Sequence, residues 1–469
     1  MVLQKDITEY NAWDICLWDM KIMKRNDYEK PRIVVIGGGF AGLNFIKHLS
    51  SSDFEVTLVD KNNFNYFTPL LYQVATGFLE PSSISYPLRK LVNTKGFNFR
   101  QGELCSIDSD NSRIKLTDGD ELEYDHLVIA AGTKTNFFGN ANIQEKAFEL
   151  KEISDALSMR NALIRILERA SVESDPNVRA KLLTIVIAGG GPTGVEVAGM
   201  LAEMNEQIVG EDYPELEEER LEIHIVDGGP HLLAPMSDKS HRAAFDVLTR
   251  LDVHVHLNEL VKRFEDDTVY LSSGNTIESA TLIWSAGVVA NSFDGIAPQV
   301  IGKGKRLLTD GFNKVSGYDN VYAIGDISIQ FTDPVYPNGH PQLAQPAIQQ
   351  GKTLAKNLNA LVKGKRQKAF KYFDRGDMAI IGKGYAVADL FKHKLHLGGL
   401  LGLLAWLLIH VISLVNYNNK VKTLYNWAIA YLTSDPSLRM IFQPNGKQHN
   451  FKPQPEPLTE GLGKKSQVA

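Results

Sequence analysis

Cysteine is nearly absent from this chain of 469 residues, which contains only Cys16 and Cys105. Two cysteines are too few for a disulfide framework, so we expect a reducing compartment. They also cannot form a redox-active pair, because Cys16 precedes the first predicted strand and Cys105 is a single small residue in a predicted core strand. The linear sequence shows no Cys-rich or His-rich cluster, and we therefore predict no metal site.

Charge of either sign is in no large excess, since the formal net charge is −5, and nothing global indicates a nucleic-acid partner. The charge is uneven, however, because residues 361–469 contain 16 Lys and Arg against 6 Asp and Glu. A basic tail on an acidic body suits contact with an anionic membrane surface. The alternative is a solvated basic face.

Long apolar runs are also scarce, and the clearest one is Leu397–Val415, with 19 residues. That length is just enough to span a bilayer as a helix. A helical face of apolar residues follows, with Thr423 and Asn426 off it; it comprises Val421, Leu424, Tyr425, Ala428, Ile429 and Leu432. Three readings are open: a monotopic module in one leaflet with Trp427 and Tyr431 at the headgroup level, one transmembrane span, or a core or homodimer interface.

Residues 1–30 do not resemble a signal peptide, because Asp14 and Asp19 interrupt any apolar core. Met23 lies just before a basic stretch and the first predicted strand. We interpret residues 1–30 as an N-terminal extension that is disordered or reflects a start codon assigned too early, with the true start near Met23.

The order strand, glycine turn, helix, strand, acidic residue occurs twice, and it is typical of a dinucleotide-binding unit. The first unit comprises strand Arg32–Gly37, helix Ala41–Leu49 and strand Glu55–Val59, followed by Asp60. The second comprises strand Leu182–Ala188, helix Val195–Met204 and strand Ile223–Val226, followed by Asp227. Two units imply two nucleotides.

The fold class is therefore α/β, with two Rossmann-like domains. A further strand, Asn320–Ile324, returns to the first domain, so the second is inserted within it. We predict a first domain over residues 31–150 and 310–370, a second over 151–309, and a helical C-terminal module over 371–469.

Gly37, Gly39 and Gly42 match the pyrophosphate fingerprint, in which the glycines permit the tight turn, the approach of the backbone and close helix packing. The helix N-terminus then offers N–H donors to the phosphates. Asp60 is placed to accept from a ribose hydroxyl. The alternative is a glycine-rich turn without a ligand.

Gly189, Gly191 and Gly194 repeat the fingerprint, with Pro192 at the first helical position. A carboxylate at Asp227 accepts from a ribose 2′-hydroxyl and repels a 2′-phosphate, which favours NADH over NADPH. Alternatively, Asp227 only begins the turn that follows it.

Two further acids carry both a functional and an ordinary interpretation. Glu196 lies in a first helical turn, where the helix dipole alone stabilises an acid. Asp326 ends the segment VYAIGD and is either part of a Gly-Asp turn or a group that binds flavin ribityl hydroxyls.

The motifs GGGFAG, GGGPTGVEVAG and VYAIGD, in this order and spacing, resemble those of the flavoproteins with two dinucleotide-binding domains. Pro69–Gly77 (PLLYQVATG) and Leu343–Gly351 (LAQPAIQQG) narrow the resemblance to the type II NADH dehydrogenases, single-chain NADH:quinone oxidoreductases. The resemblance covers about residues 31–440.

This resemblance implies non-covalent FAD in the first domain, NADH as substrate in the second, and no metal. It assigns Gly37, Gly39, Gly42, Asp60 and Asp326 to FAD, and Gly189, Gly191, Gly194 and Asp227 to NADH. Glu196 matches an acid near nicotinamide and flavin. The quinone-site signature is matched by Ala344, Gln345, Ala347, Gln349 and Gln350. Lys383 matches a basic residue near the quinone only loosely, and an exposed turn lysine is the alternative.

The expected function is oxidation of NADH by a membrane quinone, ubiquinone or menaquinone, without proton pumping. The resemblance and the basic flanks favour the monotopic reading, on the cytoplasmic face of the inner membrane. The alternatives are a soluble NADH oxidase and a non-catalytic NADH-sensing flavoprotein on the same scaffold.

Overall fold

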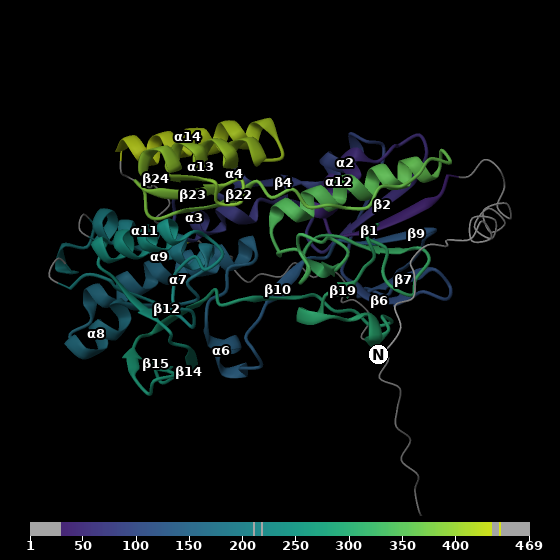
Figure 1. The fold of residues 1–469 in the computed structure, drawn as a ribbon. Coiled ribbons are helices and arrows are strands. Elements are labelled where there is room, and N and C mark those ends of the chain that lie inside the picture. Colours follow the sequence, from purple (N-terminus) through teal and green to yellow (C-terminus); the bar gives the residue numbers. More distant parts are fainter. Residues whose placement is uncertain (1–29, 210–211, 217–218, 434–439, 442–469) are drawn as a thin grey trace, which may run out of the picture.

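The computed structural model describes residues 30–209, 212–216, 219–433 and 440–441. The predicted N-terminal extension, with Cys16 and Met23, lies outside the described residues, except for Lys30. Within them, two α/β units lie side by side, and a smaller C-terminal module lies over the second unit (Figure 1).

The first unit is built on a five-stranded parallel sheet, in which each central strand is a buried, β-branched run of the kind that needs cover on both faces. In spatial order its strands are β20 (Val321–Ala323), β9 (His126–Ile129), β1 (Arg32–Ile36), β2 (Glu55–Asp60) and β5 (Asn98–Gln101). Strand β20, which follows the second unit in the sequence, pairs with β9 of the first unit. This confirms the prediction that the chain returns to the first domain after the second one.

Two helices pack together beside this sheet, α2 (Phe40–His48) and α12 (Ala344–Leu361). Their backbones approach so closely that a Cβ added to Gly351 would lie 2.3 Å from the carbonyl oxygen of Ala41. The glycine that ends LAQPAIQQG is therefore required by helix packing.

The second unit has a four-stranded parallel sheet with the order β13 (Val253–Leu257), β12 (Glu222–Asp227), β11 (Thr184–Ala188) and β17 (Thr281–Trp284). Strand β11 begins two residues later than predicted, because Leu182 and Leu183 end helix α8 (Pro176–Leu183). Helix α9 (Pro192–Met204) follows the glycine turn. The antiparallel pair β10 (Thr133–Thr135) and β18 (Val288–Ala290) joins the two units.

The sequence predicts a helical C-terminal module, but the structure shows that the module also contains a sheet. It begins with an antiparallel sheet of β22 (Gly376–Ile380), β23 (Ala386–Leu390) and β24 (Leu395–Gly398). Helices α13 (Gly399–Ser413) and α14 (Tyr417–Thr433) then lie above this sheet (Figure 1). The predicted apolar run is thus shorter as a helix, because its first residues belong to β24.

Helix α14 turns its polar side inward. Asn419 donates to the carbonyl oxygens of Ser82, Ser83 and Ser85 at 2.9–3.2 Å. Trp427 is 5% exposed and donates from Nε1 to Oε1 of Gln73 at 2.7 Å, so its predicted place at a membrane surface is wrong. The predicted apolar face points outward.

In the part of the chain that the structure describes, no helix combines the length and the apolar character needed to cross a membrane.

Candidate functional site

The first glycine turn leaves one side open where a pyrophosphate would lie. Gly37 has φ +100°, and a Cβ there would lie 2.4 Å from the carbonyl oxygen of Ala130. A Cβ on Gly42 would lie 2.0 Å from the carbonyl oxygen of Gly37, whereas one on Gly39 would meet nothing within 4 Å. The fold therefore requires Gly37 and Gly42, and Gly39 at the start of α2 faces free space suited to a phosphate.

Asp60 lies beside this glycine turn and is hydrogen-bonded to its backbone. Its Oδ2 accepts from the backbone N–H of Gly38 at 2.6 Å, and its Oδ1 from that of Asn62 at 2.8 Å. Burial raises the pKa of Asp60, and these two hydrogen bonds oppose the rise. Asn65, which the sequence did not single out, donates to the carbonyl oxygen of Gly38 at 2.8 Å.

The second turn repeats this construction. Gly189 has φ +110°, and a Cβ on Gly194 would lie 1.8 Å from its carbonyl oxygen, whereas one on Gly191 would meet nothing within 4 Å. Asp227 Oδ2 accepts from Gly190 N–H at 2.6 Å, and Oδ1 from Gly229 N–H at 2.7 Å. Asp227 thus holds both the glycine turn and the turn that follows it, and its role toward a ribose hydroxyl stays a prediction.

Asp326 is half-buried and lies in a charged environment just after β20, the edge strand of the first sheet. Burial raises its pKa, and Lys151 and Arg306 oppose the rise. Burial lowers the pKa of Lys151, which donates from Nζ to Thr133 Oγ1 at 3.1 Å. The sequence missed both cations because they lie far from Asp326 along the chain. A half-buried carboxyl with two cations fits a polar, partly anionic cofactor such as FAD.

Glu196 is a deeply buried acid, 8% exposed, at the junction of the second unit and the C-terminal module. Burial raises its pKa well above the usual value, and interactions with the backbone of Ile380 and the side chain of Trp406 oppose the rise. The nearby Tyr72 also has a raised pKa, chiefly through burial. Burial at this junction therefore favours the protonated form of Glu196.

Helix α13 contributes two aromatic residues, Trp406 and His410, to the junction between the second unit and the C-terminal module. Trp406 is fully buried, and His410 stacks on it with ring centroids 3.9 Å apart. His410 donates from Nδ1 to the carbonyl oxygen of Trp406 at 2.8 Å, and burial lowers its pKa to about 4. Neither role was predicted, because both residues read as part of an apolar run.

The glutamines of the quinone-site signature are all engaged with backbone groups. Gln345 donates to the carbonyl oxygen of Gly376 at 2.8 Å, and Gln349 to that of Phe373 at 2.9 Å. Each also accepts a backbone N–H from the same segment. Gln350 accepts from Gly325 N–H at 2.6 Å. These contacts favour a structural role, in which a polar face of α12 fixes the chain that enters β22.

The two alanines of the signature differ in position. Ala344 begins α12 and is half-buried, and Ala347 is buried where a Cβ on Gly325 would lie 3.4 Å from its Cβ. Their small size therefore permits close packing of α12 on the turn before Asp326.

Lys383 lies in a tight loop between β22 and β23. Its backbone N–H donates to Glu203 Oε1 at 2.7 Å, and its Nζ lies 5.7 Å from the ring centroid of Tyr431. A Cβ on Gly199 would lie 2.3 Å from Gly382 N, so α9 and this loop are in close contact. Lys383 is half-buried, rather than the exposed turn lysine of the alternative reading.

Cys105 lies in strand β6 (Leu104–Asp108) as predicted, but its side chain is exposed rather than part of the core. Cys105 falls at a register shift of β6, between Leu104 and Ser106 in the pairing with β7 (Arg113–Leu116), which leaves its side chain outside the core. Among the described residues it is the one cysteine, so they contain no redox-active pair.

Two Rossmann-type units in one chain, each with a glycine turn held by a strand-end carboxylate, define a class of nucleotide-dependent oxidoreductase. A model of the pyridine nucleotide-disulphide oxidoreductase family matches residues 31–351, and the chain belongs to this family. Within it, the chain is 34% identical over 421 residues to the type II NADH:quinone oxidoreductase NdhA of Mycobacterium tuberculosis, covering 86% of this chain and 87% of the relative. The relative Ndh of the same organism is 33% identical over 420 residues, covering 86% and 89%. The chain is thus a member of the type II NADH:quinone oxidoreductases.

Solved structures agree on the fold. NDH2 from Plasmodium falciparum in complex with NADH matches with a TM-score of 0.81 and 22% identity, covering 88% of this chain and 100% of that one. The sulfide:quinone oxidoreductase from Aquifex aeolicus matches with a TM-score of 0.67 and 18% identity, covering 86% and 95%. At these identities the likeness concerns the fold alone.

Proposed function

We propose that this protein oxidises NADH and reduces a membrane quinone, ubiquinone or menaquinone, through one non-covalently bound FAD, without pumping protons. The observation that carries the proposal is the repeated glycine–carboxylate site, with Asp60 in one unit and Asp227 in the other. Bound FAD supplies the redox chemistry, and the chain supplies position and electrostatics.

The residues have distinct parts in this proposal. Gly39 and Asp326 bind FAD, and Gly191 and Asp227 bind NADH. Glu196 holds a proton where the second unit meets the C-terminal module, and it is placed to give that proton to a reduced quinone. Gln345 and Gln349 position the chain that leads into β22, whose last residue, Ile380, contacts Glu196.

Purified protein should be yellow, and NADH oxidation should depend on added quinone. NADH should be preferred over NADPH, because Asp227 would face a 2′-phosphate with its negative charge. The flavin spectrum and the rates with each nucleotide, with and without quinone, check this. Turnover that needs only oxygen would indicate the soluble oxidase instead, and no turnover would indicate the non-catalytic flavoprotein.

We further propose that the outward apolar face of α13 and α14 binds the membrane surface from one side. Its exposed side chains include Leu400, Leu401, Leu404, Leu408, Ile412, Val421, Leu424 and Leu432. Lys422 of α14 and Lys392 and Lys394, in the turn between β23 and β24 of the same module, are exposed and suit anionic headgroups. The cytoplasmic side of the inner membrane is the side we propose.

The double variant Leu404→Asn, Leu408→Asn should lose most of its binding to vesicles of mixed neutral and anionic phospholipid. Both side chains are more than half exposed, so the fold should tolerate the change. Co-sedimentation with the vesicles measures the binding. Phe245→Ser, at an exposed apolar residue of α11 (Asp238–Arg250), is the matched control and should bind as the wild type does. Unchanged vesicle binding combined with loss of a homodimer would assign this face to self-association.

A further inference from the structure

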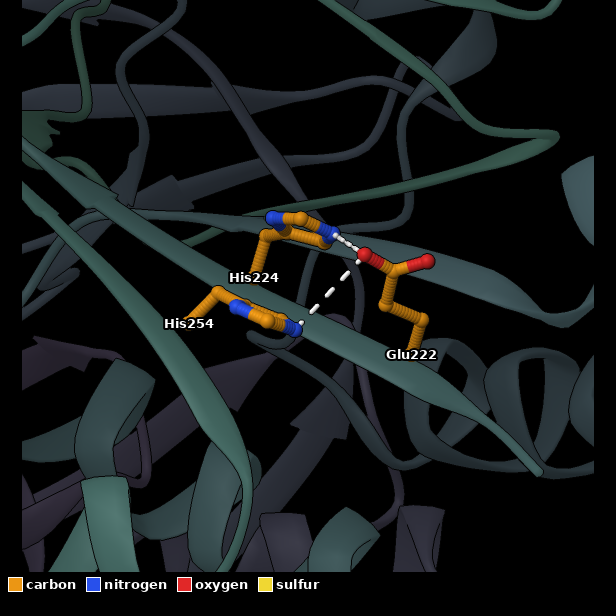
Figure 2. A group of neighbouring side chains, drawn as sticks. All are labelled: Glu222, His224 and His254. Carbon is orange, nitrogen blue, oxygen red and sulfur yellow. Dashed lines mark hydrogen bonds and ion pairs between the residues drawn. The ribbon is translucent and has the colours of Figure 1, made fainter.

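Three side chains of the second sheet converge on one face: Glu222 and His224 of β12, and His254 of β13 (Figure 2). His224 and His254 are direct partners in the parallel register, and Glu222 lies two residues before His224, on the same face. Oε1 of Glu222 lies 3.0 Å from Nε2 of His224 and 3.6 Å from Nε2 of His254. The sequence did not group them, because the two strands are distant along the chain.

We propose that Glu222, His224 and His254 form a binding site for a divalent transition-metal ion of the zinc(II) class. A tetrahedral zinc ion with bonds of about 2.0–2.1 Å holds its ligand atoms about 3.3–3.4 Å apart, and the distances from Glu222 Oε1 to the two Nε2 atoms lie on either side of this value. The rings of His224 and His254 stack with centroids 4.7 Å apart, so the exposed His254 ring has to turn toward the ion when it binds. Two imidazoles and one carboxylate suit zinc and its neighbours, whereas magnesium and calcium prefer oxygen ligands. Water completes the fourth position.

His256 of β13 contacts the ring nitrogen of His224 that faces away from Glu222. Its Nε2 lies 3.0 Å from Nδ1 of His224. A metal-bound Nε2 carries no proton, so Nδ1 of His224 keeps the ring proton and donates it to His256, which fixes both the tautomer and the ring orientation. Without metal the opposite tautomer fits, with His256 donating to Nδ1 and His224 donating from Nε2 to Glu222.

The exposure of the ligands suits reversible binding. The side chain of His224 is 9% exposed, while those of Glu222 and His254 are 53% and 56% exposed. An ion can therefore enter from solvent and meet one fixed imidazole and two adjustable ligands.

The proposed metal site lies at the opposite end of β12 from the expected NADH site. Glu222 begins β12 and Asp227 ends it, so about 16 Å of strand lies between them at ~3.3 Å per residue. A bound ion would link β12 to the edge strand β13 at the end away from the glycine turn. Metal binding should therefore stabilise the second unit and leave quinone-dependent turnover at saturating NADH unchanged.

The test uses metal-stripped, FAD-loaded protein titrated with zinc(II) in a calorimeter, with the Tm measured alongside. We expect saturable binding and a higher Tm with zinc. His254→Ala and Glu222→Gln should each weaken binding roughly tenfold or more and abolish the rise in Tm. Both side chains are exposed, so both variants should fold.

The control is His231→Ala, which removes an exposed histidine stacked on His241 at 4.8 Å in the same unit, outside the cluster. It should bind zinc as the wild type does. Equal affinity in the wild type and both cluster variants would place the ion elsewhere, for example at Cys105, and would overturn the proposal. No saturable binding in the wild type would overturn it too.

Discussion

Alanine in place of Gly191 should weaken NADH binding about tenfold or more, and alanine in place of Gly39 should weaken FAD binding, with neither change lowering the stability of the ligand-free protein. An added Cβ meets no protein atom within 4 Å at either residue. The φ angles, −72° at Gly191 and −76° at Gly39, are ordinary for any residue. The new methyl group would therefore occupy only the space that the pyrophosphate needs.

Gly194→Ala is the matched contrast, because its Cβ would lie 1.8 Å from the carbonyl oxygen of Gly189. This variant should lose stability as well as NADH binding. Flavin content per chain, the Kd for NADH by stopped flow and the Tm of the apoprotein separate the three cases. Loss of FAD rather than NADH from the Gly191 variant would reverse the assignment of the two units.

The glycine turns could be predicted from the sequence because their chemistry is local. Each depends on a strand, a turn and a helix within a few residues, and on one acid at the end of the next strand. Asp60 and Asp227 lie where the pattern placed them, and the structure adds that each carboxylate also holds the backbone of its own turn.

The surroundings of Asp326 and Glu196 could not be predicted in this way. Lys151 and Arg306 reach Asp326, and Trp406 reaches Glu196, only through the packing of segments far apart in the chain. No spacing rule connects such residues, and tryptophan within an apolar run looks the same whether it faces a lipid or a buried carboxyl.

Helix α14 shows a subtler limit. The spacing of its apolar residues correctly predicts a helix. The same spacing does not tell which face of that helix is buried. Asn419 and Thr423 lie inward because the carbonyl oxygens of Ser82, Ser83 and Ser85 need donors there. Buried carbonyl groups without partners cost more than an exposed apolar stripe.

Glu196→Gln should slow quinone-dependent reoxidation of the flavin about a hundredfold, with a much smaller effect on its reduction by NADH. Because burial raises the pKa of Glu196 well above the usual value, it favours the protonated form of the wild-type side chain, which carries a transferable proton. Glutamine has the same shape and can form hydrogen bonds, but it cannot release a proton. Stopped-flow measurement of the two half-reactions checks this, and equal losses in both would indicate a structural role for Glu196.

The same variant should be more stable than the wild type in alkaline solution. The carboxyl has a pKa near 4.5 when unfolded and a higher pKa when folded, so above pH 4.5 the folded state binds more protons. Stability of the wild type therefore falls as the pH rises through this window, by up to about 1.4 kcal/mol per pH unit from this group, and glutamine removes that dependence. The Tm of the variant minus that of the wild type should be smallest at and below pH 4.5 and should grow as the pH rises above it, whereas Glu55→Gln at an exposed residue should show no such growth. A gap independent of pH would mean that the buried carboxyl is ionised in the folded protein, and the role of Glu196 as a proton donor would then have to be abandoned.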